Sequence, residues 1–277
     1  MSPKEQRLVI VGCGTMGEAI LGGLLRAGKV EPEQVMLTSR REDEAARLQQ
    51  VHGVTAVTDN RAACAQGTVA LVALKPQRMG QVLDDDDMRE ALAGKLVISI
   101  AAGVRTATLQ RWLPQSEVIR AMPNTPCLIG EGMTVLAAGP GVGPQQLAYA
   151  RGIFEAVGRV IELEDKHMDA VTSLNGSGPA FAYVILEAFA DGGVMMGLPR
   201  NVALQIAAQV LQGSARMVLD TGSHPAALKD QVTTPAGSTI AGLLTMEDGR
   251  IRSVLARAIQ EATRVAGGLG GLDGDKK

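Results

Sequence analysis

The chain has 277 residues, of which 46% are hydrophobic and 20% charged, a composition typical of a globular protein with one large domain or two modest ones. Its formal net charge of −2 argues against general electrostatic binding to nucleic acid or to an anionic membrane. The three cysteines, Cys13, Cys64 and Cys127, lie far apart, so neither a disulfide framework nor a metal site is expected. Because only a short polar lead precedes the first predicted strand, we expect no signal peptide and a cytoplasmic protein.

The first motif is Gly12-Cys-Gly-Thr-Met-Gly17, which directly follows the apolar run Leu8–Val11 and precedes a helical pattern. Strand, glycine turn and helix in this order are the dinucleotide-binding G-x-G-x-x-G motif. Gly12 would allow the tight turn, Gly14 would let the backbone approach a pyrophosphate, and Gly17 would let the helix pack on the strand. The pyrophosphate would lie against the amino end of that helix. The alternative is a glycine-rich turn that binds nothing.

Up to residue 163, short apolar runs alternate with helical segments, which is the pattern of a mostly parallel sheet with helical crossovers. The predicted strands are Leu8–Val11, Val35–Leu37, Val54–Val57, Val69–Ala73, Leu96–Ile100, Val118–Ala121, Met133–Ala137 and Val160–Glu162. We therefore predict an α/β fold with a Rossmann-like domain over residues 1–163.

The end of the second predicted strand indicates which dinucleotide is bound. A turn that binds NAD usually carries Asp or Glu there, to hold the ribose 2′-hydroxyl. This chain reads Thr38-Ser-Arg-Arg41 instead, and Arg40 and Arg41 could bind a 2′-phosphate with paired charged hydrogen bonds. We predict NADPH, with NADH as the second candidate. Alternatively, the two arginines start an exposed helix and pair with the acidic run Glu42–Glu44.

Three later loops follow predicted strands at their carboxyl ends, where open α/β sheets bind ligands. They are Ala73-Leu-Lys-Pro-Gln77, Ile100-Ala-Ala-Gly-Val104 and Arg120-Ala-Met-Pro-Asn-Thr-Pro126, and each could equally be plain turn chemistry. Asn60 is interpreted from its spacing as a helix N-cap. The run Asp84–Asp87 is interpreted as a solvated charge run, because no other ligand residues converge on it. We predict no metal site.

From residue 164 the strand pattern ends and helices follow. The helix predicted over Ala180–Gly192 is apolar on nearly every face and must therefore be buried, but Glu187 and Asp191 interrupt it too soon for a membrane span. Because little chain remains to cover it, we predict an all-helical dimerisation domain over residues 164–277, with a disordered tail at about 268–277. Further helices are predicted over Arg200–Asp220 and from Arg250 to about Gly267.

The stretch Val232-Thr-Thr-Pro-Ala-Gly-Ser-Thr239 is a break between helices that is rich in hydroxyl groups. Backbone N–H groups at a helix start near Ser238 would suit a small carboxylate. The alternative is a well-capped helix connection. The break holds no group for nucleophilic catalysis, and His167 and His224 are interpreted as structural or surface residues.

With these motifs assembled, the chain closely resembles the pyrroline-5-carboxylate reductase family over nearly its whole length. The resemblance rests on Gly12–Gly17, Leu74–Gln77, Ala101–Val104, Met122–Pro126, Gly176–Ala180, Asp191–Val194 and Val232–Thr239. It implies NAD(P)H-dependent reduction of 1-pyrroline-5-carboxylate to L-proline, the last step of proline biosynthesis. It also implies a Rossmann domain, a helical dimerisation domain and a homodimer that can assemble further, often into a decamer.

The resemblance also assigns site residues. It gives cofactor contacts to Gly12, Gly14, Thr15, Met16, Ser39, Asn60, Ala73, Lys75 and Ala101. The same motifs bring in Cys13, Gly17, Leu74 and Pro76, which join Arg40 and Arg41, predicted above from the end of the second strand. Ser238 and Thr239 match substrate-contacting positions, and Asp165 matches an acidic residue near the product in some relatives. Many relatives have Pro-Gly-Gly where this chain has Pro235-Ala-Gly237. If the first of those glycines needs a positive φ, Ala236 strains the loop by about 1 kcal/mol or more.

For such a reaction we expect the protein mainly to align the nicotinamide C4 with the imine carbon. Backbone N–H groups around Gly237, Ser238 and Thr239 would bind the substrate carboxylate. The Thr239 hydroxyl would assist proton supply to the ring nitrogen, which makes it the catalytic candidate. Two other functions stay open: a β-hydroxyacid-type dehydrogenase, with Lys229 as its catalytic lysine, and an NADP(H)-binding regulator without turnover.

Overall fold

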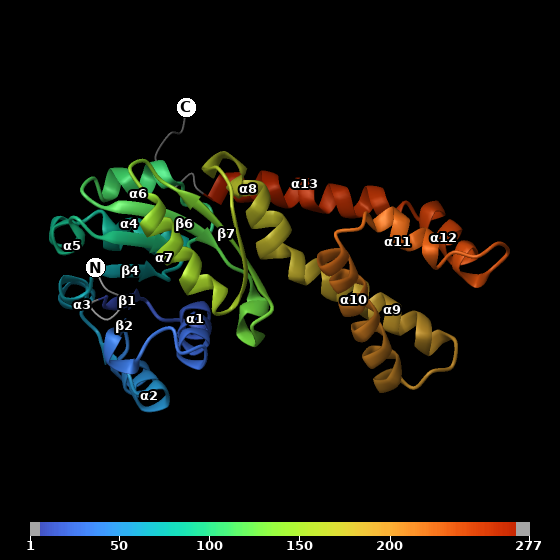
Figure 1. Cartoon of the computed structure of the whole chain (residues 1–277), viewed down its shortest axis with the longest axis horizontal. Coiled ribbons are helices and arrows are strands. Elements are labelled where there is room, and N and C mark those ends of the chain that lie inside the picture. Colours follow the sequence, from blue (N-terminus) through green and yellow to red (C-terminus); the bar gives the residue numbers. More distant parts are fainter. Residues whose placement is uncertain (1–5, 270–277) are drawn as a thin grey trace. The chain divides into compact units, whose positions relative to one another are not determined.

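The computed structural model describes residues 6–269 (Figure 1). Its contacts divide the chain into two compact units: unit 1, residues 1–176 and 262–277, and unit 2, residues 177–261. This division falls later than residue 163, because Met168 and Val171 of the short helix α8 (Met168–Val171) form a small core with Val135 and Ala137 of the sheet. The π-helix η5 (Thr172–Ser177) then leads into unit 2.

Unit 1 is built on one eight-stranded sheet in the order β3-β2-β1-β4-β5-β6-β7-β8. Neighbouring strands are parallel except β6 and β7, which are antiparallel. The strands are β1 (Leu8–Val11), β2 (Val35–Thr38), β3 (Thr55–Val57), β4 (Val69–Val72), β5 (Leu96–Ser99), β6 (Glu117–Met122), β7 (Gly132–Ala138) and β8 (Gly158–Glu162). The predicted α/β class with a mostly parallel sheet is confirmed.

Helices cover both faces of this sheet, which is why its central strands β1 and β4 are continuous apolar runs, buried throughout. Leu8 and Ile10 of β1 lie in one core cluster, and Val9 and Val11 lie in the other. The first cluster is completed by α1 (Thr15–Arg26), α2 (Glu42–His52) and α7 (Pro144–Glu155). The second is completed by α3 (Asn60–Gln66), α4 (Pro76–Leu83), α5 (Asp86–Leu92) and α6 (Thr106–Trp112). Short 3-10 turns are η2 (Pro32–Gln34), η3 (Thr125–Ile129) and η4 (Asp165–His167).

Unit 2 is helical, as predicted. Its helices are α9 (Gly178–Met195), α10 (Arg200–Thr221), α11 (Pro225–Gln231), α12 (Ser238–Asp248) and the first part of α13 (Ile251–Leu269). The hydrophobic core between α9 and α10 is built on Ala190, Ala203 and Ala207, whereas large side chains such as Tyr183 and Val184 are more than 60% exposed. This helical region therefore leaves much of its apolar surface uncovered within one chain.

Two expectations about the helices can be compared with the structure. Among residues 6–269, no helix combines the length and the apolar character needed to cross a membrane. The tail is predicted to start at about 268, and α13 continues to Leu269. The rest of that predicted tail lies outside the described residues.

Candidate functional site

The glycine turn has the geometry that its spacing predicts. Gly12 has a φ of +76°, and a Cβ there would lie 2.3 Å from Cδ2 of Leu74. Its N–H donates to Oγ1 of Thr38 at 2.9 Å, and the next N–H, of Cys13, donates to the Thr38 carbonyl at 2.9 Å. The positive φ and the contact with Leu74 therefore both disfavour a side chain at Gly12, and the turn is tied to the end of β2.

The other two glycines differ in what surrounds them. A Cβ on Gly14 would meet no atom within 4 Å, so the backbone there faces open space. A Cβ on Gly17 would lie 3.3 Å from both Ala73 and Ile10, which is the close helix–strand approach expected. No side chain of the described residues caps the amino end of α1. The turn therefore presents open backbone and a helix amino end, which suits a pyrophosphate.

Cys13 contributes its backbone to the turn rather than its thiol. The side chain is 4% exposed, and burial raises the pKa of the thiol to about 12, with the charge of Glu18 acting in the same direction. The thiol is therefore protonated at neutral pH and unreactive. Thr15 and Met16 begin α1 beside it, exposed and half-buried respectively.

The two arginines after β2 have different surroundings. Arg41 precedes α2 and forms ion pairs with Asp43 at 3.4 Å and Glu44 at 3.7 Å. Arg40 is exposed and has no ion-pair partner among the described residues. Arg41 therefore pairs with the acidic run at the start of α2, as the alternative for both arginines predicts. Arg40 remains free to bind an anion. The half-buried Ser39 donates its N–H to Val57 at 3.0 Å.

An ion cluster that sequence reasoning missed joins α1 to α2. Arg47 donates to both oxygens of Glu18, at 3.0 and 2.7 Å, and also to Glu44 at 2.8 Å. The ring of His52 lies 2.9 Å from Glu18. The hydrogen bond from Arg47 is the main cause that lowers the pKa of Glu18. Spacing along the chain offered no signal for this cluster, because Glu18 and Arg47 belong to different helices.

The remaining predicted cofactor residues lie at the same edge of the sheet, since β1 to β5 are parallel and each loop follows a carboxyl end. Ala73 donates its N–H to Val11 at 2.8 Å and Ala101 is 2% exposed, while Leu74, Lys75 and Pro76 lead into α4. The interpretation of Asn60 as an N-cap is wrong, because Asp59 accepts the capping hydrogen bond from Ala62 at 3.0 Å. The side chain of Asn60 has no hydrogen-bond partner among the described residues and is available to a ligand.

The loop after β6 is braced by two asparagines. Asn124 accepts the N–H of Met133 at 2.9 Å and donates to Asn175 at 3.0 Å. Asn175 in turn donates to the carbonyls of Met122 at 2.7 Å and Met133 at 2.9 Å. These bonds hold η5 against the β6–β7 corner. Asn124 therefore has a structural role in its loop, which is the alternative to ligand binding that the sequence left open.

Asp165 lies in η4, where protein groups already surround its carboxylate. Oδ1 accepts from Arg120 at 3.2 Å, and Oδ2 accepts the N–H of Thr106 at 3.3 Å. Arg120 is 1% exposed and also donates to Asp169 at 3.4 Å. Sequence reasoning singled out the loop that Arg120 begins but gave this residue no role.

The break before α12 lies in unit 2. Ala236 has a φ of +57°, so the strain expected of an alanine at this position is present. Gly237 precedes α12 and donates its N–H to the Thr234 carbonyl at 3.2 Å, and a Cβ there would lie only 2.5 Å from Oγ1 of Thr234, too close to fit without a shift. Ser238 is exposed and Thr239 half-buried, and no side chain of the described residues caps this helix. The amino end of α12 is therefore open, unlike the capped connection of the alternative.

The other candidates have structural partners. Nδ1 of His224 accepts the N–H of Ala226 at 3.2 Å, which caps α11, and His167 is exposed. Lys229, the lysine of the dehydrogenase alternative, forms an ion pair with Asp230. The acidic run also has partners: Asp84 and Asp86 pair with Arg89, and Asp87 pairs with Arg61. Within residues 6–269, no group of three or more His, Cys, Asp or Glu could hold a metal ion.

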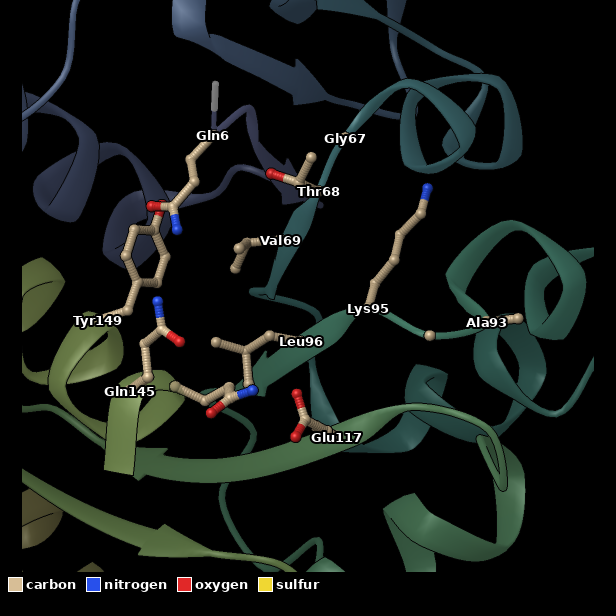
Figure 2. A pocket seen from close by; sticks show the side chains of 12 residues that line it. Gln6, Gly67, Thr68, Val69, Ala93, Lys95, Leu96, Glu117, Gln145 and Tyr149 are labelled. Carbon is tan, nitrogen blue, oxygen red and sulfur yellow. The ribbon is translucent and has the colours of Figure 1, made fainter. Parts of the chain in front are cut away.

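A cavity of about 400 Å³ lies at the opposite edge of the sheet, where β4, β5 and β6 begin (Figure 2). Val69 and Leu96 supply apolar surface, and Thr68, Glu117 and Tyr149 point polar groups toward it. Burial raises the pKa of Tyr149 to about 12. Because ligands of open α/β sheets bind at carboxyl ends, this cavity does not belong to the predicted cofactor site.

Two family models match separate parts of this chain. A family model for pyrroline-5-carboxylate reductase dimerisation matches residues 165–269, and one described as NADP oxidoreductase coenzyme F420-dependent matches residues 7–103. Pyrroline-5-carboxylate reductase of Schizosaccharomyces pombe is 41% identical, covering 94% of this chain and 98% of its own length. The enzyme of that name from Synechocystis is 42% identical, with 95% and 98% covered.

Solved structures of proteins with the same name are also similar to this chain. A pyrroline-5-carboxylate reductase from Coxiella burnetii superimposes with a TM-score of 0.89 at 32% identity, covering 96% of this chain and 98% of its own. The pyrroline carboxylate reductase of Plasmodium falciparum, solved with NADP bound, has a TM-score of 0.86 at 27% identity, with the same shares covered.

Proposed function

The chain belongs to the pyrroline-5-carboxylate reductase family, and from this premise we propose that it reduces 1-pyrroline-5-carboxylate to L-proline with NADPH, completing proline biosynthesis. The observation that carries the proposal is the glycine turn, whose open backbone at Gly14 and uncapped helix suit a dinucleotide, in a chain similar to these enzymes over almost its full length. NADPH bound there would supply the hydride for the imine carbon.

We assign cofactor binding to the loops at the carboxyl edge of the sheet. The turn from Gly12 to Gly17 would hold the pyrophosphate, and Ser39 with Arg40 would bind the 2′-phosphate. Arg41 contributes less, because its guanidinium already pairs with Asp43 and Glu44. Asn60, Ala73 to Pro76 and Ala101 would line the rest of the dinucleotide. NADH, which lacks the 2′-phosphate, would bind more weakly.

We assign substrate binding to the amino end of α12. Backbone N–H groups at Gly237, Ser238 and Thr239 would bind the carboxylate of the substrate. The Thr239 hydroxyl would hydrogen-bond the ring nitrogen and hold the proton that makes the imine electrophilic. Asp165 would act near the product.

The proposed organisation is an NADP(H)-binding domain over residues 1–163 and a dimerisation and substrate domain over residues 164–277. The uncovered apolar side chains of unit 2 support a homodimer. Further assembly into a decamer and a cytoplasmic location belong to the same proposal.

Oxidation of NADPH, followed by its absorbance, tests the activity. Consumption that depends on pyrroline-5-carboxylate and yields proline is expected, with NADH slower. Formation of NADPH from NADP⁺ with β-hydroxyacids as substrates would favour the dehydrogenase, and binding of NADPH without turnover would favour the regulator.

Variants test the two assignments. Thr239→Ala should lower kcat about 100-fold, whereas Thr245→Ala, whose hydroxyl bonds only its own helix at Ala241, is the matched control. Near-full activity of the first variant would remove Thr239 from the mechanism. Arg40→Ala should reduce the preference for NADPH over NADH by about tenfold, and Arg41→Ala should reduce it less.

A further inference from the structure

Arg120 is a cation held in the interior of unit 1. It lies in β6, opposite Ser99 of β5, and is 1% exposed. Its guanidinium donates to Asp165 at 3.2 Å and to Asp169 at 3.4 Å, while its Nε is buried without a partner. A buried ion pair of this kind is weak evidence for stability, because its desolvation offsets the attraction. Stability alone therefore does not explain why Arg120 is buried with these two carboxylates.

Both carboxylates are shared with a second segment of the chain. The other oxygen of Asp165 accepts the N–H of Thr106 at 3.3 Å, and the other oxygen of Asp169 accepts from Arg105 at 3.4 Å. Arg105 and Thr106 start α6 directly after the loop that follows β5. Two guanidiniums, two carboxylates and one backbone N–H thus join β6, η4, α8 and the start of α6.

The loop connected in this way is Ile100–Val104. It leaves the carboxyl end of β5, three strands across the sheet from β2, where Arg40 would bind the phosphate of the adenosine half. In a dinucleotide laid along this edge, the loop after β5 faces the half that carries the reacting ring. A shift of Thr106 would therefore move the wall beside the nicotinamide and leave the glycine turn in place.

We propose that Arg120 is a positioning residue for hydride transfer, which sets the loop Ile100–Val104 through Asp165 and Asp169. The proposal rests on the proposed function and deepens it. The role assigned to Arg120 is exerted through Asp165 and Asp169, the two side chains to which its guanidinium donates. Its planar fork holds the two carboxylates at a fixed separation, and Asp165 in turn holds the first N–H of α6.

Three variants test the proposal. Arg120→Met removes the charge, and Arg120→Lys keeps the charge but loses the fork. Thr106→Pro removes the N–H that Asp165 accepts and replaces the buried threonine side chain with the proline ring. Proline is favoured at the first position of a helix, and Arg105 before it has the extended backbone that proline requires. Arg151→Met is the matched control, because Arg151 pairs with Glu162 at the surface of the same unit.

The readouts separate positioning from folding. Because misplacing a reactant by an ångström can slow a reaction about 100-fold, Arg120→Met should lower kcat between about 10- and 100-fold and Thr106→Pro about tenfold. The isotope effect on kcat with NADPH deuterated at C4 should rise, since hydride transfer becomes limiting. Affinity for 2′-phospho-ADP-ribose, which lacks the nicotinamide, should stay within about threefold of wild type. Arg120→Lys should recover part of the rate, and Arg151→Met should match wild type.

Other outcomes would overturn the proposal. Unchanged kcat and isotope effect in Thr106→Pro would do so even if Arg120→Met failed to fold. An equal loss of affinity for NADP⁺ and for the fragment would indicate general damage instead. If the wild type itself reduces no imine, the proposed function fails. In that case the affinities of the variants for NADP⁺ and for 2′-phospho-ADP-ribose still test Arg120. The variants should change the affinity for NADP⁺ and leave the affinity for 2′-phospho-ADP-ribose unchanged.

Discussion

Ala236 offers a direct measurement of backbone strain in the substrate loop. Its φ of +57° lies in the left-handed region, where a residue with a Cβ is destabilised by about 1–2 kcal/mol. The side chain is exposed, so Ala236→Gly removes little packing. Glycine also gives the unfolded chain more freedom, which offsets about 0.4–1 kcal/mol. The variant should therefore increase the free energy of unfolding by about 1 kcal/mol.

Urea denaturation at one fixed protein concentration measures this change, because stability that depends on assembly varies with concentration. Gly222→Ala is the matched control in the same unit. Gly222 ends α10 with a φ of +66°, and an added Cβ would meet no atom within 4 Å, so only the backbone is tested. It should lower the free energy of unfolding by about 1 kcal/mol. A less stable Ala236→Gly, or a neutral Gly222→Ala, would refute the reasoning.

Three further predictions concern other parts of the molecule. Gly12→Ala would place a Cβ 2.3 Å from Leu74 at a residue with a positive φ. It should weaken NADPH binding at least about tenfold, as measured by fluorescence titration. Unchanged affinity for NADPH would contradict the role of the turn. Val184→Asp, on a side chain that is 65% exposed, should reduce the mass measured by light scattering to that of a smaller species, and an unchanged mass would place the interface elsewhere. Glu18 has a lowered pKa, so its bond to Arg47 adds stability above the unfolded pKa of about 4.3 and loses it as the pH falls through the folded pKa. Arg47→Met should therefore reduce the free energy of unfolding more at pH 7 than at about pH 3, and equal losses at both pH values would count against this pair.

The parts of the fold that could be predicted from the sequence are those encoded by neighbours along the chain. Gly12, Gly14 and Gly17 lie within six residues, and their spacing between strand and helix is enough to predict their three separate roles. The sequence also predicts backbone strain at Ala236 if that position has a positive φ, because this strain depends on one residue and one dihedral angle. The distinction between Asp59 and Asn60 as the cap was not, since neighbouring polar residues compete for one position.

What the sequence does not reveal depends on contacts between distant segments. Arg120 reaches Asp165 across 45 positions, and neither residue carries a local pattern that names the other. The same holds for Asn124 and Asn175, which are 51 positions apart. Spacing also did not indicate that β7 runs antiparallel to β6. The direction of a strand depends on its connection and packing rather than on its own apolar residues.

The alanines that join α9 and α10 have a consequence for the newly made chain. Of the hydrophobic residues that the structure describes, only Leu186 and Val194 pack against these three buried alanines, which is little apolar surface to hold a helical hairpin together in water. Unit 2 therefore depends for stability on cover for its exposed apolar side chains. If the proposed homodimer supplies that cover, a freshly synthesised subunit would have to meet another copy before proteases and chaperones remove it. Cellular abundance would then respond to the rate of synthesis more steeply than in simple proportion, because two copies are needed for either to survive.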